Sequence, residues 1–179
     1  MPFLNSLASL LNCWPKEIKA HLPDVRDESS SIAINSTDAK KLFSNGMGLL
    51  FNEAQEISPV LIRWLEEIRL GLGISAMTYS RCLIYATPKD SGTAPHFDQN
   101  MNFVVQIRGE KTWWMAPNQS VQNPLTRHTM SAEPDAELAS YTEGEMPIKM
   151  PEDAQKFILK PGSVLFVPRG YWHSTEAHE

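Results

Sequence analysis

The chain has 179 residues, which suits one domain of ordinary size or one domain with a short additional arm. Its 16 basic and 21 acidic side chains give a formal net charge of −5. Sequence-independent binding to nucleic acid depends on clustered basic residues, so this mildly acidic chain predicts no nucleic-acid partner. Hydrophobic residues make up 42% of the sequence, as in globular proteins that bury a core.

The two cysteines, Cys13 and Cys82, form neither a CxxC motif nor a Cys/His pattern. They predict neither a disulfide framework nor a structural zinc site. No apolar run approaches the ~20 residues that a helix needs to span a bilayer. The apolar start of the chain lacks the basic segment and the cleavage site of a secretory signal. These features predict a cytoplasmic protein with no membrane partner.

The first half of the chain predicts short helices and loops. Apolar spacing favours a helix from Leu4 to Leu11, and the polar segment 24–31 predicts a loop. Ser36 can cap a short helix that stops at Asn45-Gly46, since glycine supplies the left-handed residue after a helix. Residues 48–51 predict a strand.

Residues Pro59 to Leu70 carry the clearest helix signal. Ser58 is a suitable N-cap, and proline is favoured at the first helical position. Val60, Trp64 and Ile68 lie four residues apart and form an apolar stripe. We therefore expect Trp64 to pack in the core.

The second half changes to the pattern of short strands. Residues 81–86 predict a buried strand, and residues 102–107 and 110–116 predict a hairpin that turns at Arg108-Gly109. Three further strands are predicted at 156–159, 164–167 and 172–175, separated by Pro/Gly turns. Many short strands with such turns favour a β-barrel or a β-sandwich.

Residues 117–155 differ from the strands on either side. This stretch contains five prolines and seven acidic residues, against Arg127 and Lys149. A segment of this length between strands is usually functional or disordered. We interpret it as an insertion over one mouth of the barrel, with a solvated loop as the alternative. Its acidic character would suit a basic substrate.

Two histidines stand in a pattern that suits a metal. In His96-Phe97-Asp98, residues two apart on an extended chain project to the same face. One imidazole and one carboxylate offer two ligands, and His173, just after a tight turn, is the candidate third. Two histidines and one carboxylate leave coordination positions open, as in non-haem Fe(II) oxygenases. A closed structural zinc site would need four protein ligands.

The other histidines carry no such signal. His21 lies in a polar stretch and is expected at the surface, and His178 lies in the tail. His128 lies in the 117–155 segment, where it is expected to be structural, with a contact to substrate as the alternative.

Three segments together resemble a known family. Residues 91–98 (SGTAPHFD), 102–114 (NFVVQIRGEKTWW) and 159–173 (LKPGSVLFVPRGYWH) are similar to the JmjC/cupin-like Fe(II)- and 2-oxoglutarate-dependent oxygenases. The pattern is similar to that of the asparaginyl hydroxylase of hypoxia-inducible factor and of ribosomal oxygenases. The resemblance covers most of residues 49–175.

The resemblance implies a fold and a set of ligands. The expected fold is mainly β with N-terminal helices, a double-stranded β-helix (cupin or jelly-roll) barrel. Fe(II) is expected on His96, Asp98 and His173, and Lys111 is expected to pair with the distal carboxylate of the cosubstrate 2-oxoglutarate. Thr93 and Asn102 match positions that hydrogen-bond the cosubstrate in similar enzymes. Trp113 and Trp114 are expected to serve packing.

The lysine can also be argued from its place in the sequence. On the predicted second strand of the hairpin, Lys111 shares a face with Trp113 and Met115. A lysine on a buried barrel face needs an anionic partner. A surface lysine at a hairpin end is the alternative.

The resemblance also implies a division of the chain. It separates an N-terminal helical arm, 1–48, from an oxygenase domain, 49–179, with the insertion at 117–155. Members of the family have another barrel strand after the last histidine ligand, and Glu179 follows His173 by six residues. We therefore expect a barrel that lacks its last strand, or one closed by the arm or by the partner subunit of a homodimer.

The resemblance implies an activity. It is O2-dependent hydroxylation of a C–H bond, coupled to decarboxylation of 2-oxoglutarate to succinate and CO2. The substrate is expected to be a protein or peptide side chain, with a small molecule left open. Two alternatives remain: a cupin-like binding module without turnover, and a metallo-cupin of another reaction class, such as an isomerase.

Overall fold

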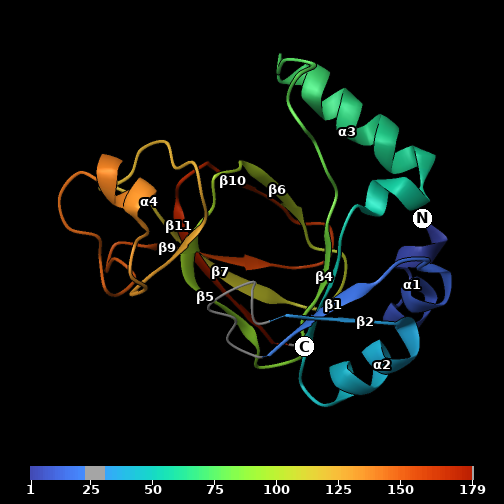
Figure 1. Ribbon diagram of the computed structural model, residues 1–179. Coiled ribbons are helices and arrows are strands. Elements are labelled where there is room, and N and C mark those ends of the chain that lie inside the picture. The colour runs from blue at the N-terminus through green and yellow to red at the C-terminus, as the bar shows by residue number, and fades with distance from the viewer. Residues whose placement is uncertain (23–30, 179) are drawn as a thin grey trace. The chain divides into compact units, whose positions relative to one another are not determined.

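The computed structural model describes residues 1–22 and 31–178, which form two compact units (Figure 1). The N-terminal unit contains residues 1–22 and 31–87, and the C-terminal unit contains residues 88–178. The polar segment 24–31, predicted to be a loop, lies outside the described residues except for Ser31. The compact units divide after Thr87, whereas the division at 48/49 came from a family resemblance and stays a prediction.

The N-terminal unit combines short helices with one antiparallel sheet. Its elements are η1 (Pro2–Leu4), α1 (Leu7–Cys13), β1 (Ile18–His21), β2 (Ile32–Ile34), α2 (Ser36–Ser44), β3 (Gly48–Phe51), η3 (Ala54–Ile57), α3 (Pro59–Gly71) and β4 (Ile84–Ala86). The sheet order is β2-β1-β3-β4. The core gathers around Trp14, Ile18, Leu49 and Phe51. Because β1 lies between two strands, His21 is buried, and its predicted surface position is wrong.

Capping residues explain where the helices begin. The Ser6 hydroxyl accepts a hydrogen bond from the Ser9 amide (3.0 Å), so α1 starts at Leu7 and the predicted helix from Leu4 is divided. Asn35, one residue before the predicted cap, accepts from the Asp38 amide (2.9 Å) at the start of α2. Gly46, at φ +88°, follows the end of this helix as predicted.

Helix α3 has the predicted position but does not bury its whole stripe. Leu61 is buried, whereas Trp64 is 41% exposed and Val60 is 48% exposed. The prediction that Trp64 lies in the core is therefore wrong. Within its unit, α3 packs along the short turn η3, which is too small to cover an apolar stripe of this width. Strand β4 is shorter than predicted, and Tyr85 at its centre is exposed.

The C-terminal unit contains two antiparallel sheets. Its elements are β5 (Gly92–Phe97), β6 (Asn102–Val105), β7 (Lys111–Ala116), β8 (His128–Thr129), α4 (Ala136–Tyr141), β9 (Gln155–Leu159), β10 (Val164–Val167) and β11 (Trp172–Ala177). The larger sheet has the order β8-β5-β11-β7-β9, and the smaller pairs β10 with β6. Met115 and Leu159 of the larger sheet pack with Leu165 and Val167 of the smaller, so a core lies between the sheets.

The predicted hairpin of residues 102–116 is wrong, although both of its strands exist. Strand β6 pairs with β10, and β7 pairs with β11 and β9 in the other sheet. Beyond β6, the Gln106 amide donates to the Ser163 carbonyl (3.0 Å), which keeps the chain beside β10. Gly109, at φ +64°, then turns the chain across to the larger sheet. The turn was predicted correctly, but it joins two sheets instead of two neighbouring strands.

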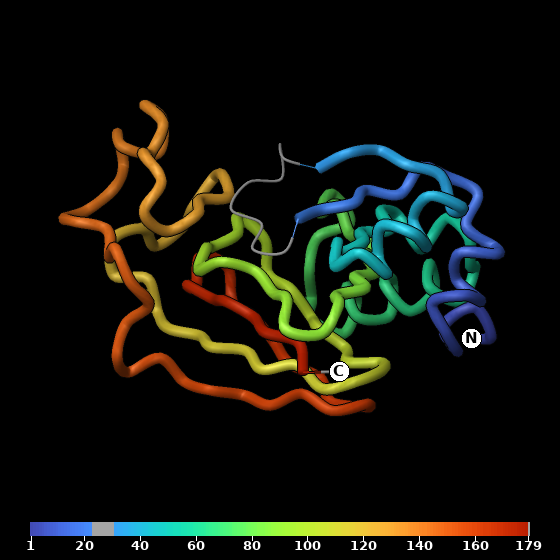
Figure 2. Tube along the Cα trace, turned by 90° about the horizontal axis from the view of Figure 1, so that it is seen from below, coloured from blue at the N-terminus to red at the C-terminus, as the bar shows by residue number. Residues whose placement is uncertain are grey.

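Residues 117–155 fold back onto the larger sheet. Val121, Met130 and Leu138 pack with Phe97 and Trp172. These two aromatic residues alternate with His96 and His173, so this core lies on the face of the sheet that points away from the smaller sheet. Figure 2 shows the segment, in yellow to orange, gathered at one end of the strands.

His128 belongs to this second core. Its ring lies 5.6 Å from the Phe97 ring and 6.3 Å from the Trp172 ring, measured between centroids. Burial lowers the pKa of His128. This packing agrees with the structural role expected for this histidine.

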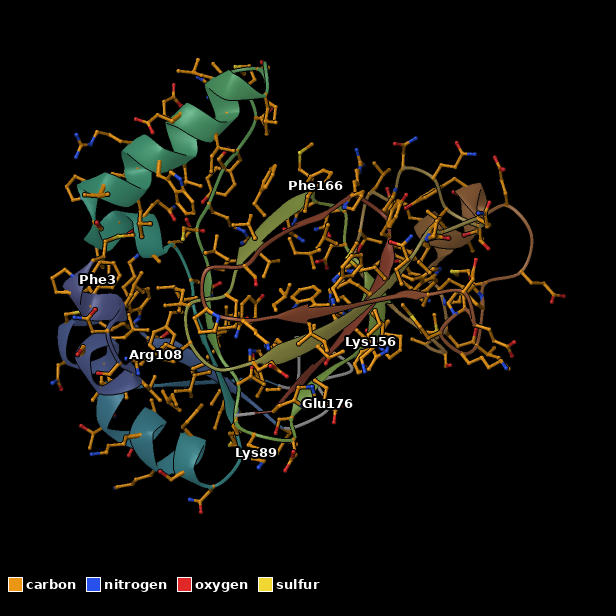
Figure 3. All side chains as sticks on the ribbon, turned by 180° about the vertical axis from the view of Figure 1, so that it is seen from behind. Phe3, Lys89, Arg108, Lys156, Phe166 and Glu176 are labelled. Carbon is orange, nitrogen blue, oxygen red and sulfur yellow. The ribbon has the colours of Figure 1, made fainter. Side chains whose placement is uncertain are left out.

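The remaining part of the same sheet face carries polar side chains. Figure 3 labels Lys156 on β9 and Glu176 on β11. Lys156 lies opposite Trp114 in the strand register, with its ammonium 5.7 Å from the indole centroid.

Among the described residues, no helix is long and apolar enough to cross a bilayer.

Candidate metal centre

His96, Asp98 and His173 meet on the inner face of the larger sheet. His96 on β5 lies directly opposite His173 on β11, and Asp98 follows the end of β5. One donor atom from each residue lies within 4.8 Å of the other two. The Asp98 carboxylate is 3.9 Å from His96 Nε2 and 3.6 Å from His173 Nε2. The residues predicted from the sequence are thus brought together by one strand pair.

Backbone contacts orient both imidazole rings. His96 Nδ1 lies 2.8 Å from the Ala94 carbonyl, and His173 Nδ1 lies 2.9 Å from the Tyr171 carbonyl. A carbonyl can only accept, so each Nδ1 carries the proton and each Nε2 keeps its lone pair. Metal-binding histidines are usually oriented in this way. The free lone pairs face Asp98.

The surroundings keep both rings neutral. Burial lowers the pKa of His96 well below its usual value, and the neighbouring His173 and Arg127 act in the same direction. Burial also lowers the pKa of His173, against the opposing effect of the Asp98 carboxylate. A neutral imidazole is the form that binds a metal.

The Asp98 carboxylate is contacted from two further sides. The Asn102 amide nitrogen donates to Oδ2 (3.2 Å), and Arg127 Nε lies 3.7 Å from Oδ1. The Asp98 carbonyl accepts from the Gly170 amide (3.0 Å), which joins Asp98 to the turn before β11. Asn102, predicted to contact the cosubstrate, therefore lies beside a candidate metal ligand.

Sequence reasoning missed Arg127. Arg127 is one of two basic residues in the acidic segment 117–155. It lies 29 positions after Asp98, and no sequence motif links Arg127 to Asp98. The signal that could have singled it out is an arginine among many acids.

A β-bulge places Thr93 on the same face as the histidines. In the register of β5 against β11, His96 pairs with His173 and Thr93 pairs with Thr175. The step between these two pairs is three residues on β5 and two on β11, so β5 contains one extra residue. Without the bulge, residues 93 and 96 would point to opposite faces. The Thr93 and Thr175 hydroxyls lie 3.0 Å apart. Thr93 is thus inside the unit, as its predicted cosubstrate role requires.

Lys111 and Trp113 extend this inner face along β7. They share this face with Met115, further along the strand, which lies in the core between the sheets. Burial lowers the pKa of Lys111 from 10.5 to about 8. The Trp113 ring stacks on the His173 ring, with centroids 5.7 Å apart and planes at 18°. Trp113 Nε1 is buried and has no hydrogen-bond partner within residues 1–22 and 31–178.

This arrangement fits both a metal and an anionic ligand. Two neutral imidazoles and a carboxylate suit Fe(II) and leave positions open for other ligands. A buried ammonium and a buried indole donor on the adjacent strand suit a carboxylate. The site can therefore hold a metal beside a bound organic acid.

Comparison with known proteins agrees with this geometry. Residues 62–179, about two thirds of the chain, match the JmjC domain. An uncharacterised protein of Bacillus subtilis, YxbC, is 34% identical over 161 residues, which are 87% of this chain and 49% of YxbC. Ribosomal oxygenase 1 of Rattus norvegicus is 29% identical over 143 residues, 79% of this chain and 21% of that protein.

A solved structure supports the fold. The crystal structure of YcfD from Escherichia coli superposes with a TM-score of 0.59 and 21% identity, covering 98% of this chain and 43% of YcfD. The chain thus spans about half the length of these relatives, or less. The predicted fold, sheet-rich with N-terminal helices and a cupin barrel, is confirmed. On the extent of the family match, this chain belongs to the JmjC domain family and is related to the ribosomal oxygenases.

Proposed function

We propose that this protein is an Fe(II)- and 2-oxoglutarate-dependent oxygenase that hydroxylates a C–H bond with O2. One observation carries the proposal: two oriented, neutral histidines and a carboxylate converge on the same inner face as a buried lysine. A cation in an apolar interior is costly unless it meets an anion. The Lys111 ammonium, whose pKa burial lowers, would be placed to meet the carboxylate of an organic acid bound beside the metal.

Each residue has a separate task in this proposal. His96, Asp98 and His173 would hold the iron through Nε2, a carboxylate oxygen and Nε2. Lys111 would hold the distal carboxylate of 2-oxoglutarate, and Thr93 would contribute a hydroxyl from β5, on the other side of β11. Bound iron supplies the chemistry of O2 activation. The surrounding apolar core would exclude water.

The substrate proposed is a protein or peptide side chain. Relatives named ribosomal oxygenases support this class. The acidic segment 117–155 would favour a basic peptide, since opposite charges steer association. Reversal of three of its acidic residues to lysine should abolish a preference for basic over acidic peptides in a binding assay. An unchanged preference would refute this assignment of the segment.

The first test is an anaerobic titration with Fe(II) and 2-oxoglutarate, followed by the visible charge-transfer band of the chelated keto acid. The band should form in the wild type, disappear in His96→Ala and require much more 2-oxoglutarate in Lys111→Ala. Lys89→Ala, which changes an exposed lysine, should match the wild type. If wild-type protein forms no band, the oxygenase proposal fails for this chain and a binding module without turnover takes its place.

A further inference from the structure

Residues 124–130, here called the strap, run beside the metal centre and are fixed at their start. Arg169 Nε and Nη2 both donate to the Pro124 carbonyl, at 3.1 and 2.6 Å. Gly170, at φ +80°, packs so closely that an added Cβ would lie 2.9 Å from the Pro124 ring. His173 follows Gly170 by three residues. The start of the strap is therefore attached to the turn that leads into β11, the strand of His173.

The end of the strap is fixed to the other ligand strand. His128 and Thr129 form β8, which pairs with Phe97 and His96 of β5. The Met130 amide donates to the Pro95 carbonyl (2.8 Å), which extends this pairing. The strap therefore connects the strands that carry the two histidines, and Arg127 lies between its two attachments.

The Arg127 side chain is itself directed. Its Nη1 donates to the buried Thr129 hydroxyl (2.9 Å), and its Nε lies 3.7 Å from Asp98 Oδ1. Asn102 occupies the other oxygen, Oδ2. The carboxylate is thus held from both sides, while the two histidine Nε2 atoms face it at 3.9 and 3.6 Å.

Asp98 has reason to need this support. It follows the last residue of β5, and its backbone is joined to the turn before β11 through the Gly170 amide. Its side chain is 23% exposed, whereas the two histidine side chains are 8% and 4% exposed. Of the three candidate ligands, the carboxylate is the one that packing fixes least.

We propose that Arg127 is a positioning residue of the metal centre, which holds the Asp98 carboxylate in the orientation that a divalent metal requires. This inference rests on the proposed metal site. Arg127 is also a cation near a dication, so charge repulsion alone would weaken metal binding. The two effects predict opposite results when the guanidinium is removed: loss of positioning lowers metal affinity, and loss of repulsion raises it.

Co(II) binding to the full chain, read from its visible absorption spectrum, tests the proposal. Arg127→Gln should weaken Co(II) binding by about 10–100-fold, the usual effect of removing a group that orients a metal ligand. Arg127→Lys should have an intermediate Co(II) affinity. It keeps the positive charge but loses the planar guanidinium that contacts Thr129 and Asp98 at the same time. Arg108→Gln, which changes an exposed arginine between β6 and β7, should match the wild type.

A second variant leaves the guanidinium in place. Thr129→Val keeps the size of the side chain and removes the hydroxyl that directs Arg127, so it should weaken Co(II) binding in the same direction by a smaller factor. If Arg127→Gln fails to fold, Arg127→Lys and Thr129→Val decide the question. Melting of the metal-free variants shows whether the fold is intact.

The outcomes separate this proposal from the function on which it rests. If the wild type binds no Co(II), the metal site itself is wrong. If the wild type binds and folded Arg127→Gln binds as tightly or more tightly, the site stands and the positioning role is refuted. An altered Co(II) spectrum in Arg127→Gln, with unchanged melting of the metal-free protein, supports positioning over general destabilisation.

Discussion

Replacing Lys111 with methionine should stabilise the metal-free protein at pH 7. Burial lowers the pKa of this lysine from 10.5 to about 8. At 1.36 kcal/mol per pKa unit, this difference of about 2.5 corresponds to about 3 kcal/mol. The native state bears this cost wherever the ammonium is charged, that is, below about pH 8. Methionine has a similar length and no charge, so the variant should unfold with a free energy larger by about 3 kcal/mol.

The cost of the buried Lys111 charge depends on pH. Between about pH 8 and pH 10.5, Lys111 is neutral in the native state and charged in the unfolded state. The unfolded state then binds more protons, so stability rises with pH across this window. Above it both states are neutral, and the cost is gone. The advantage of Lys111→Met should therefore be complete below pH 8 and vanish near pH 10.5.

Urea unfolding at pH 7.0 and at several values up to pH 10.5 measures both effects. The difference between wild type and Lys111→Met cancels the titration of other groups, and Lys89→Met is the exposed control. The variant should also lose its affinity for 2-oxoglutarate, which is the exchange of stability for function typical of a working site. Equal stability of the two proteins at pH 7, or a difference that does not shrink between pH 8 and 10.5, would refute the argument.

Two paired substitutions test the sheet and the site. Gly92→Ala should cost at least about 4 kcal/mol in urea unfolding, because its Cβ would lie 1.7 Å from the Thr175 carbonyl oxygen. Gly71→Ala, with open space around the residue in α3, should raise the free energy of unfolding by up to about 1 kcal/mol. Equal effects of the Gly92 and Gly71 substitutions would contradict the tight contact between β5 and β11. Co(II) should quench tryptophan fluorescence mainly through Trp113, which stacks on the ring of the candidate ligand His173, so Trp113→Phe should remove most of the quenching. Trp114→Phe, on the opposite face, should retain it, and a reversed result would place the metal elsewhere.

The three residues of the candidate metal centre, which the structure brings together, could be picked out because their signals are local. His96 and Asp98 stand two residues apart on extended chain. The Pro/Gly turn before His173 indicated that a strand begins there. Strand β3 was placed at its observed bounds, and α3 nearly so, since proline, glycine and apolar spacing act over a few residues. Ser58 stands at the predicted N-cap of α3, but its hydroxyl makes no capping hydrogen bond.

Features that depend on distant parts of the chain were not predictable. A turn of Arg108-Gly109 serves a hairpin or a crossing between sheets equally well, and the pairing of β6 with β10 decides which. The bulge that brings Thr93 inside is visible only against β11. Arg127 reaches Asp98 because Pro124 and Met130 are fixed elsewhere, and none of those contacts has a local sequence pattern.

The opposition of His96 and His173 in neighbouring strands has a consequence for folding. These residues lie 77 positions apart in the sequence (96 against 173), yet they are direct partners in the β5–β11 ladder. Closing so long a loop slows folding, because the chain loses entropy before the contact forms. The three candidate ligands come together only when this pairing is complete. A metal that binds them therefore stabilises the finished topology by mass action, and the rate at which a refolding chain gains Co(II) absorption should report the closure of the barrel itself.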